Sequence, residues 1–219
     1  MGELIVFEGI DGSGKSTQFK MMCERLEAEG HEFRSIVFPR YDKPSGVLAK
    51  MYLSGEFGKD PDSVNAYAAT SFYAVDRIAS YLQDWREYYE SGGLVITDRY
   101  TTSNALHQGA KMATEDREAF FKWLYEYEFD YLGLPRPSRV FLMDIEAGIA
   151  AKRLVRRQNE TGTDGDIHEK DMNHLENCVQ SGRQVAELYG WDIVECAPNG
   201  LPRSEDEIHQ ELYEMLINR

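Results

Sequence analysis

Five short apolar runs recur along the sequence, and longer stretches with apolar residues at helical spacing separate them. The runs occupy residues 4–7, 35–38, 94–97, 140–143 and 193–196. Short runs rich in β-branched and aromatic residues are typical of strands that are buried on both faces. Strands that alternate with helices predict a parallel sheet, because each helix returns the chain to the edge where the next strand begins. We therefore expect a single α/β domain over residues 1–219, with a five-stranded parallel sheet flanked by helices.

The helical stretches carry start and stop signals of their own. One pattern begins at residue 16 and ends at the glycine at position 30, where a helix stop is expected. A second begins with the Asp-Pro pair at 60–61 and extends to Gly92, since proline is favoured in the first helical turn. Ser204 and Glu207 have the spacing of a capping box for the last helix. The segment 158–166 is polar, joins two helical patterns and has the composition of a mobile lid.

The segment between the first predicted strand and the first predicted helix fits the pattern G-x-x-x-x-G-K-S from Gly9 to Ser16. Glycines allow this loop backbone angles that a Cβ would forbid, so that successive N–H groups can turn inward around a polyphosphate. The start of the helix adds its positive dipole end. Lys15 would reach the β- and γ-phosphates, and the Ser16 hydroxyl would take one position on Mg²⁺.

The alternative is a glycine-rich turn with an ordinary surface lysine, but the spacing and the flanking elements both match a P-loop. The sequence therefore predicts the P-loop NTPase fold and a site for ATP and Mg²⁺. The residues that we expect to bind the nucleoside triphosphate are Gly9, Ile10, Asp11, Gly12, Ser13, Gly14, Lys15, Ser16 and Thr17.

Composition and charge narrow the class of protein. The chain has 219 residues and a formal net charge of -14 at pH 7, which argues against nucleic acid as a partner, because backbone phosphates are bound by basic surfaces. No apolar run approaches the length of a membrane span, and no signal-peptide pattern is present before the first strand. Cys23, Cys178 and Cys196 show no C-x-x-C spacing, so we interpret them as reduced core thiols. These features predict a cytoplasmic protein.

Charged residues follow several of the predicted strands, at the edge where parallel sheets bind their ligands. Asp98 and Arg99 come directly after the third strand, beside the P-loop. The carboxylate can act in the Mg²⁺ shell or as a base, whereas the guanidinium can clamp a phosphate at two points. An ordinary salt bridge at a strand end is the alternative. The polar residues that follow at helical spacing favour a binding site: Ser103, Asn104, His107 and Gln108.

Tyr73 and Arg77 are spaced four residues apart on another predicted helix. An aromatic ring beside a guanidinium suits a flat heterocycle, because the ring can stack while the guanidinium donates to a carbonyl. Tyr73 also fits the role of a core aromatic, since the same helix carries several other aromatic residues. Arg77 is harder to explain as a core residue.

Arg153, Arg156 and Arg157 occupy positions i, i+3 and i+4 just before the polar segment. On a helix they share one face and repel one another unless an anion lies between them. Cations on a mobile segment suit phosphoryl transfer, in which charge spreads over the transferring group and solvent must be excluded. A solvated basic face is the alternative. The segment then continues with side chains that could order a closed lid, reach Mg²⁺ or remain solvated: Asp166, His168 and Glu169.

With these features the chain resembles the thymidylate kinase family, nucleoside monophosphate kinases that make dTDP from dTMP and ATP. The resemblance covers almost the whole chain. The segments that carry it are F-E-G-I-D-G-S-G-K-S-T at 7–17, F-P-R-Y at 38–41, the pair Tyr73 and Arg77, D-R-Y-T-T-S-N at 98–104, L-G-L-P-R-P at 132–137, and the lid at 153–169. P-loops occur in many families, whereas the motif D-R-Y-x-x-S after a P-loop occurs in far fewer families.

The resemblance implies roles for residues that would bind dTMP. Asp11 would lie near the 3′-hydroxyl of the sugar, and Arg99 would bind the phosphate. In F-P-R-Y either Arg40 or Tyr41 would contact the phosphate, because family members differ in that position. Many family members have tyrosine at the position of His107, so their contact with the sugar at this position does not carry over directly to this chain. The thymine ring would be held by Phe38, Tyr73, Arg77 and Asn104.

The resemblance also implies how the transferring phosphoryl group is stabilised. The variable P-loop positions contain no arginine, so the lid would supply it from Arg153 or Arg157. The adenine pocket would be shallow and lie near Arg153 and the loop at 197–200. Lys15, Arg99 and the lid arginines would stabilise the charge, while Ser16, Asp98 and Glu169 would hold the metal.

Two other functions are compatible with a P-loop. A deoxynucleoside kinase would phosphorylate a free 5′-hydroxyl, but Arg99 with Arg40 or Tyr41 beside the acceptor favours a substrate that already carries a phosphate. A nucleotide-binding switch protein would have no use for acceptor residues, and the chain lacks an N-K-x-D guanine signature. Members of the family usually form homodimers. We expect the same here, because the predicted helix at 118–131 has apolar residues on more than one face.

Overall fold

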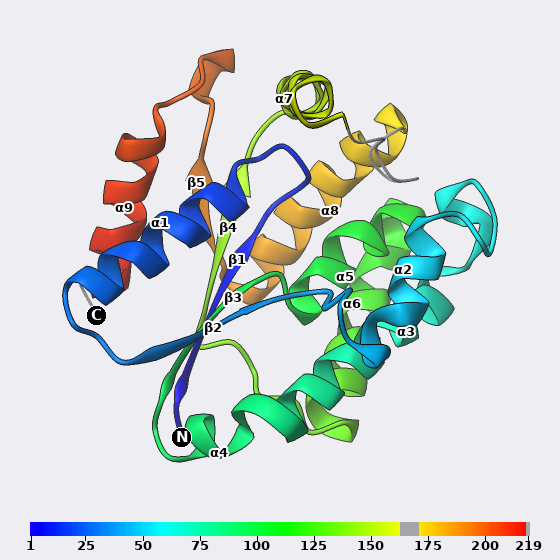
Figure 1. The fold of residues 1–219 in the computed structure, drawn as a ribbon. Coiled ribbons are helices and arrows are strands. Elements are labelled where there is room, and N and C mark those ends of the chain that lie inside the picture. Colours follow the sequence, from blue (N-terminus) through cyan, green and yellow to red (C-terminus); the bar gives the residue numbers. More distant parts are fainter. Residues whose placement is uncertain (163–170, 218–219) are drawn as a thin grey trace.

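A five-stranded parallel sheet forms the centre of the protein in the computed structural model, which describes residues 1–162 and 171–217 (Figure 1). The strand order is β2-β3-β1-β4-β5, and each neighbouring pair is parallel. The strands are β1 (Glu3–Glu8), β2 (Phe33–Val37), β3 (Leu94–Asp98), β4 (Arg139–Asp144) and β5 (Asp192–Glu195). The predicted parallel α/β sheet is confirmed, although Phe38 and Cys196 follow the observed ends of their strands.

Helices cover both faces of this sheet. Those in the described ranges are α1 (Lys15–Ala28), α2 (Val47–Leu53), α3 (Ala66–Ser80), α4 (Arg86–Glu90), α5 (Thr101–His107), α6 (Arg117–Tyr125), α7 (Ala147–Thr161), α8 (Met172–Tyr189) and α9 (Glu205–Ile217). Helices α1 and α9 pack together on one face, whereas α3 to α6 and α8 cover the other (Figure 1). No described helix has both the length and the apolar character needed to cross a membrane.

The central strand β1 lies between β3 and β4, and a hydrophobic cluster buries each of its two faces. Leu4 and Val6 point into one hydrophobic cluster, and Ile5 and Phe7 point into the other, as the twofold alternation of a strand requires. All four side chains are almost fully buried. This two-sided burial explains why the strand reads as a continuous apolar run in the sequence.

The start of α3 differs from the sequence-based prediction. Asp60 and Pro61 begin a short 3-10 turn over Pro61–Ser63 instead of the long helix. Val64 and Asn65 then adopt extended backbone angles, and the Asn65 side chain accepts a hydrogen bond from Ala68 N at 2.9 Å. The asparagine therefore caps α3, because it satisfies an N–H group that has no partner within the helix. Further along, a π-helical turn at Tyr81–Trp85 separates α3 from α4.

Other helix boundaries follow the predicted signals. Ser204 and Glu207 form the expected capping box, since Ser204 N donates to Glu207 Oε2 at 2.9 Å and Glu207 N donates to Ser204 Oγ at 3.3 Å. Helix α7 continues to Thr161 and ends at Gly162 in the left-handed conformation, so the predicted polar gap begins later than expected. The rest of the predicted lid, including Glu169, lies outside the described residues.

The predicted helix at 118–131 consists of α6 and a π-helical turn over Glu126–Tyr131. Both of its apolar faces pack mainly inside the chain, because Phe120, Phe121, Leu124, Tyr125 and Phe129 are all buried. Two aromatic residues of this segment are half-buried, and they stack on each other with ring centroids 5.2 Å apart: Trp123 and Tyr127. The homodimer stays a prediction, and the apolar surface that this segment offers to a partner is smaller than the sequence suggests.

We expect Asn65→Ala to lower the free energy of unfolding by about 1 kcal/mol, because the N-terminus of α3 loses its side-chain cap. Asn65→Asp should retain most of the stability, since a carboxylate can accept the same bond. Urea unfolding monitored by circular dichroism measures both. An Asn65→Ala variant as stable as the parent protein would contradict the observed start of α3.

Candidate active site

The P-loop joins β1 to α1 and packs against α7. Gly9, Gly12 and Gly14 have φ angles of 149°, 82° and 97°, which side chains with a Cβ rarely adopt. A Cβ at Gly12 would lie 2.5 Å from the backbone oxygen of Ala150, so this position has room only for glycine. The loop therefore takes its shape from backbone conformation and from close contact with the start of α7.

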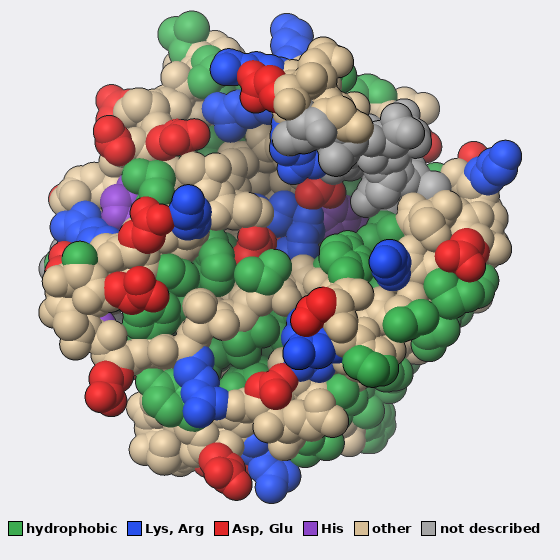
Figure 2. All heavy atoms as spheres, in the orientation of Figure 1, with side chains coloured by type: hydrophobic (Ala, Val, Ile, Leu, Met, Phe, Trp, Pro, Cys, Tyr) green, Lys and Arg blue, Asp and Glu red, His purple; other side chains and the backbone are tan. Residues whose placement is uncertain are grey.

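A cavity of about 890 Å³ opens at the carboxyl edge of the sheet, next to this loop. In Figure 2 it is the hollow near the middle of the face, with Lys or Arg side chains and a histidine on its floor. The predicted site residues that line it are Asp11, Gly12, Ser13, Gly14, Lys15, Ser16, Thr17, Phe38, Tyr41, Tyr73, Arg77, Asp98, Arg99, Ser103, Asn104, His107, Gln108, Arg153 and Arg157. Segments that are far apart in the sequence thus meet at one place.

Asp11 lies between two cations in this cavity. Its Oδ1 accepts hydrogen bonds from Lys15 Nζ at 3.3 Å and from Arg99 Nη2 at 2.5 Å. Burial by itself would raise the pKa of Asp11, but the charges of Arg99 and Lys15 outweigh it and hold that pKa well below its usual range. The carboxylate is therefore ionised at neutral pH, and it fixes the two cations that face the cavity.

Arg99 is held by contacts to both terminal nitrogens of its guanidinium. Besides Asp11, its Nη1 lies 3.4 Å from Ser103 Oγ and 2.9 Å from His107 Nε2. Its backbone has a φ of 70°, the left-handed region that is uncommon for residues other than glycine. The backbone N–H of Arg99 donates to Phe7 O at 3.1 Å, which continues the pairing of β1 and β3 through the turn. The turn thereby directs the guanidinium toward the P-loop.

Glu8 is a site residue that the sequence did not identify as functional. It has no exposed surface, and its Oε1 accepts hydrogen bonds from Thr102 Oγ1 and Ser103 Oγ, both at 2.7 Å, and from Tyr100 N at 3.2 Å. Burial raises the pKa of Glu8, while Arg99 and the two hydroxyls oppose the rise. Glu8 therefore anchors the start of α5 to the P-loop. Its signal in the sequence is a carboxylate directly after the apolar run at 4–7.

The residues expected to hold Mg²⁺ can be tested by their surroundings. Asp98 is 4% exposed and lines the cavity. Its Oδ1 has no hydrogen-bond partner among the described residues. Ser16 is exposed in the first turn of α1 and lines the same cavity. An unpartnered carboxylate oxygen and a hydroxyl are suitable ligands for this hard cation. Asp98 and Ser16 thus fit a magnesium site.

The side chains expected to hold the base lie together in the cavity. Phe38 is buried, Tyr73 is half-buried, and the ring of Tyr73 meets the edge of Tyr52 with centroids 6.3 Å apart. Both amide atoms of Gln108 are buried and have no hydrogen-bond partner within the described parts of the chain. An unpartnered buried amide that lines a cavity is suited to bind a polar ligand.

Two predicted ligand residues have side chains elsewhere. The Arg40 guanidinium forms ion pairs with Asp76 and Asp84, and Arg40 does not line the cavity. Of the two alternatives in F-P-R-Y, only Tyr41 therefore lies where a phosphate could reach it. The side chain of Ile10 belongs to the hydrophobic core, so Ile10 can contribute only its backbone to the loop.

Three arginines of α7 line the cavity, but their contacts differ. Arg153 Nη1 donates to Ser13 O at 3.3 Å and to Gly12 O at 3.5 Å, so it touches the P-loop itself. Arg156 pairs with Glu160 at 2.7 Å on the exposed surface. Arg157 is exposed. The segment around the start of α9 also lines the cavity, through Arg203, Ser204, Glu205 and Ile208. The loop at 197–200, expected near the adenine, does not line it.

The comparison with known families agrees with this geometry. The sequence model of the family described as Thymidylate kinase matches residues 7–189. The chain belongs to the thymidylate kinase family. Among its relatives, thymidylate kinase from Mycobacterium tuberculosis (strain ATCC 25618 / H37Rv) is 32% identical over 194 residues, which are 86% of this chain and 87% of the relative. Human thymidylate kinase is 32% identical over 154 residues, 69% of this chain and 65% of that protein.

A solved structure of the same family shows the shared fold. Thymidylate kinase from Candida albicans superimposes with a TM-score of 0.74 over 98% of this chain and 91% of the other, at 21% sequence identity. The family resemblance expected from the sequence is therefore confirmed over most of the chain.

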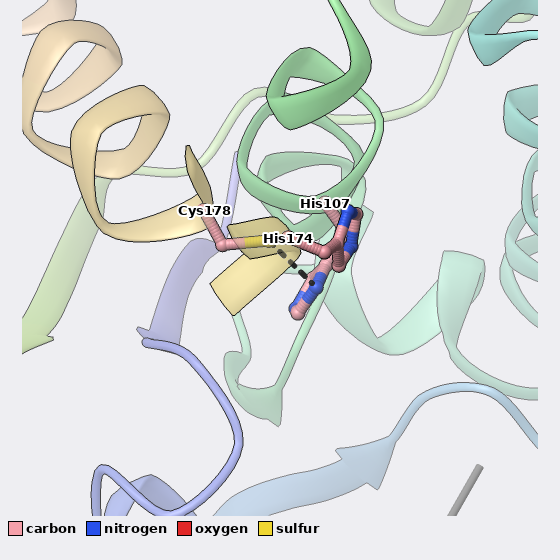
Figure 3. Close-up of side chains that lie close together, drawn as sticks. All are labelled: His107, His174 and Cys178. Carbon is pink, nitrogen blue, oxygen red and sulfur yellow. Dashed lines mark hydrogen bonds between the residues drawn. The ribbon is translucent and has the colours of Figure 1, made fainter. Parts of the chain in front are cut away.

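One group of side chains in this thymidylate kinase family member has the composition of a soft-metal site. The ligating atoms of His107, His174 and Cys178 lie within 4.8 Å of one another (Figure 3). His107 Nε2 faces a donor of Arg99, so Nε2 accepts, and Nδ1 carries the proton toward Cys178 Sγ at 3.5 Å. Burial also raises the pKa of the Cys178 thiol. These contacts favour a hydrogen-bonded relay that orients His107 toward Arg99.

The neighbouring His174, whose ring stacks on that of His107 with centroids 6.4 Å apart, gives the stability of the protein a measurable pH dependence. Burial and the charge of Lys111 lower the pKa of His174 from 6.5 to about 4, against the opposing charges of Asp171 and Asp62. Between these two values the unfolded chain binds a proton at His174 that the folded chain does not bind. Stability contributed by neutral His174 is therefore lost as the pH falls from 6.5 toward 4.

We expect the wild-type protein to lose about 2 kcal/mol more unfolding free energy between pH 7 and pH 5 than a His174→Gln variant loses. Urea unfolding at the two pH values measures the difference. His31→Gln, which removes an exposed histidine, is the control and should keep the wild-type pH dependence. The same loss in wild type and His174→Gln would show that His174 is not held neutral.

Proposed function

We propose that this member of the thymidylate kinase family transfers the γ-phosphoryl group of ATP to the 5′-phosphate of dTMP, with Mg²⁺ bound. The observation that carries the proposal is the convergence of Lys15, Arg99 and Arg153, from three separate segments, on one cavity. The reaction needs little covalent chemistry from the protein, because positioning and charge stabilisation supply most of the catalysis. The cavity contains residues for both tasks.

The P-loop side of the cavity would bind ATP. Backbone N–H groups of the loop would surround the phosphates, and Lys15 would neutralise the β- and γ-phosphates. Ser16 and Asp98 would hold Mg²⁺, which when bound neutralises charge on the phosphate oxygens. Arg203 and Ile208 line the cavity at the start of α9, which makes this segment a candidate contact for the adenosine part.

The residues that follow β2 and β3 would bind dTMP. Arg99 would clamp the phosphate of dTMP, with Tyr41 as the second contact, since Arg40 is occupied elsewhere. Asp11 would lie near the sugar 3′-hydroxyl while it holds Arg99 in place. Phe38, Tyr73, Arg77, Asn104 and Gln108 would form the surroundings of the thymine ring, and Ser103 and His107 would orient Arg99.

Arg153 is the arginine that we assign to the transferring phosphoryl group. It contacts the P-loop carbonyls of Gly12 and Ser13, so it lies beside the loop that would hold the phosphates of ATP. Arg157, on the same face, would assist when the segment beyond α7 closes. Glu169 of that segment lies outside the described residues, and its role in metal binding stays a prediction.

Two rival functions are less consistent with the site. A deoxynucleoside kinase would leave Arg99 without an acceptor phosphate, although the protein fixes this guanidinium by Asp11, Ser103 and His107. A nucleotide-binding switch would have no use for a second site beside the P-loop.

The proposal also includes a homodimer in the cytoplasm, in which Trp123 and Tyr127 would contribute to the subunit contact. Sedimentation at micromolar concentration tests that assembly, and a monomer would contradict it.

A coupled assay of ADP release across the nucleoside monophosphates tests the reaction. We expect release that depends on dTMP, ATP and Mg²⁺, and none with thymidine as the acceptor. Arg99→Ala should lower kcat/KM for dTMP by at least about a hundredfold, because the acceptor phosphate loses its clamp. Arg136→Ala, an exposed arginine paired with Asp130, is the matched control and should keep wild-type activity. Full activity of Arg99→Ala would remove Arg99 from the site.

Arginine variants along α7 test which side chain acts on the transferring group. Arg153→Ala should lower kcat by about a hundredfold, since a cation that stabilises transition-state charge is lost. Arg156→Ala should stay within about twofold of wild type, because its exposed ion pair with Glu160 contributes little. Steady-state kinetics at saturating ATP and dTMP measure both variants. Equal losses in the two variants would refute the assignment of Arg153.

A further inference from the structure

Glu128 is a buried carboxylate that none of the assigned roles uses. It has no exposed surface and lies on the π-helical turn Glu126–Tyr131 that follows α6. An ionised carboxylate inside a protein is unfavourable unless hydrogen-bond donors satisfy both of its oxygens. Glu128 therefore has to be explained by the donors that it gathers.

Each oxygen of Glu128 accepts two hydrogen bonds. Oε2 accepts from Arg77 Nε and from Thr101 Oγ1, both at 2.6 Å. Oε1 accepts from Arg77 Nη2 at 2.5 Å and from Asn104 Nδ2 at 3.4 Å. The carboxylate thus binds Arg77 in the two-point geometry that is the strongest for a guanidinium, and it holds α3 and α5 together. Two of its partners, Arg77 and Asn104, line the cavity.

The contacts leave Arg77 with a fixed orientation and spare donors. A guanidinium has five N–H groups and no acceptor. Two of them donate to Glu128, and a third, on Nη1, donates to the backbone oxygen of Tyr100 at 3.3 Å. The remaining N–H groups belong to a side chain that is 2% exposed and lines the cavity. Arg77 can therefore offer only donors to a ligand.

The contacts also fix which way the Asn104 amide points. Its Nδ2 donates to Glu128 Oε1 and to the backbone oxygen of Thr70, at 3.4 Å and 3.5 Å. Both of these partners are acceptors, so the NH₂ end of the amide must face them. No donor in the described parts of the chain reaches Asn104 Oδ1. Asn104 is thus left to offer its carbonyl oxygen, an acceptor, to the cavity.

We propose that Glu128 is the positioning residue that makes this site select a pyrimidine with a carbonyl at C4 and a proton at N3. A donor from Arg77 and an acceptor from Asn104 complement the C4 carbonyl and the N3–H of thymine. Cytosine carries an amino donor at C4 and an acceptor at N3, so the same pair would oppose it. Rejection of a base with the reversed pattern is strong where a buried polar pair is left unmatched. The inference rests on the proposed function and assigns Glu128 to its base selectivity.

Glu128→Gln tests this role in the 219-residue chain. The amide keeps the size of the side chain but places an NH₂ group against Arg77 or Asn104, which loosens both. We expect KM for dTMP to rise at least about tenfold while KM for ATP stays unchanged. We also expect the ratio of kcat/KM for dTMP over dCMP to fall at least about tenfold. Glu126→Gln is the matched control, because Glu126 lies on the same turn, is exposed and accepts a hydrogen bond from Tyr131.

Thr101 gives a second variant that does not alter the buried charge. Thr101→Val removes one donor to Glu128 and should shift KM for dTMP and the base ratio in the same direction by a smaller factor. Thr101→Ser keeps the hydroxyl and should preserve the ratio. This pair carries the test if Glu128→Gln does not fold, and thermal unfolding identifies that case.

The outcomes separate the inference from the proposed function. A wild-type protein that releases no ADP with dTMP refutes the proposed function. If wild type is active but Glu128→Gln keeps the dTMP to dCMP ratio, only the role of Glu128 is refuted. A rise of KM for ATP equal to that for dTMP would show a general structural role and would also refute it. A fall of the ratio in Glu128→Gln, with none in Glu126→Gln, supports the inference.

Discussion

Ionised side chains with little access to water meet at the carboxyl edge of β1 and β3, and the whole site depends on how they compensate one another. Asp11 is shared by Lys15 and Arg99, and Glu8 holds the segment that carries Arg99. None of these charges would be stable there alone, because the free energy lost when an ion leaves water exceeds the free energy gained from a single contact. The protein therefore fixes the positions of its cations before any nucleotide arrives. An incoming phosphate has only to compete with Asp11 for the Arg99 guanidinium, which already faces the cavity.

The architecture could be predicted because burial leaves a clear signal in the sequence. The three inner strands fall on apolar runs, since strands covered on both faces need apolar residues at nearly every position. The edge strands β2 and β5 are more exposed and overlap their runs only in part. Helix boundaries leave weaker signals. Asp60 and Pro61 are good start signals, yet Asn65 caps α3, because extended residues interrupt the helix between them. Tyr52 Oη donates to Pro61 O and Lys111 Nζ donates to Val64 O, so side chains from elsewhere in the chain hold this segment. No local rule distinguishes the two starts.

The site could be predicted where a motif carries the chemistry, and less well where function depends on a partner elsewhere in the chain. The P-loop and the Asp98 to Asn104 segment were found from spacing and do line the cavity. Arg40 and Tyr41 are equal alternatives in the sequence, because the partners of Arg40, Asp76 and Asp84, are distant along the chain. Glu128 belongs to no motif, although it stands among apolar residues of a buried helix face, which is itself a signal of a buried polar network.

The contact between Gly12 and the backbone of Ala150 also sets where Arg153 lies. A Cβ at position 12 would meet the Ala150 oxygen, so any side chain there would push the P-loop and the first turn of α7 apart. Arg153 lies one turn further along the same helix and donates to the loop oxygens of Gly12 and Ser13. A substitution of this glycine would therefore disturb an arginine that is more than a hundred residues away in the sequence.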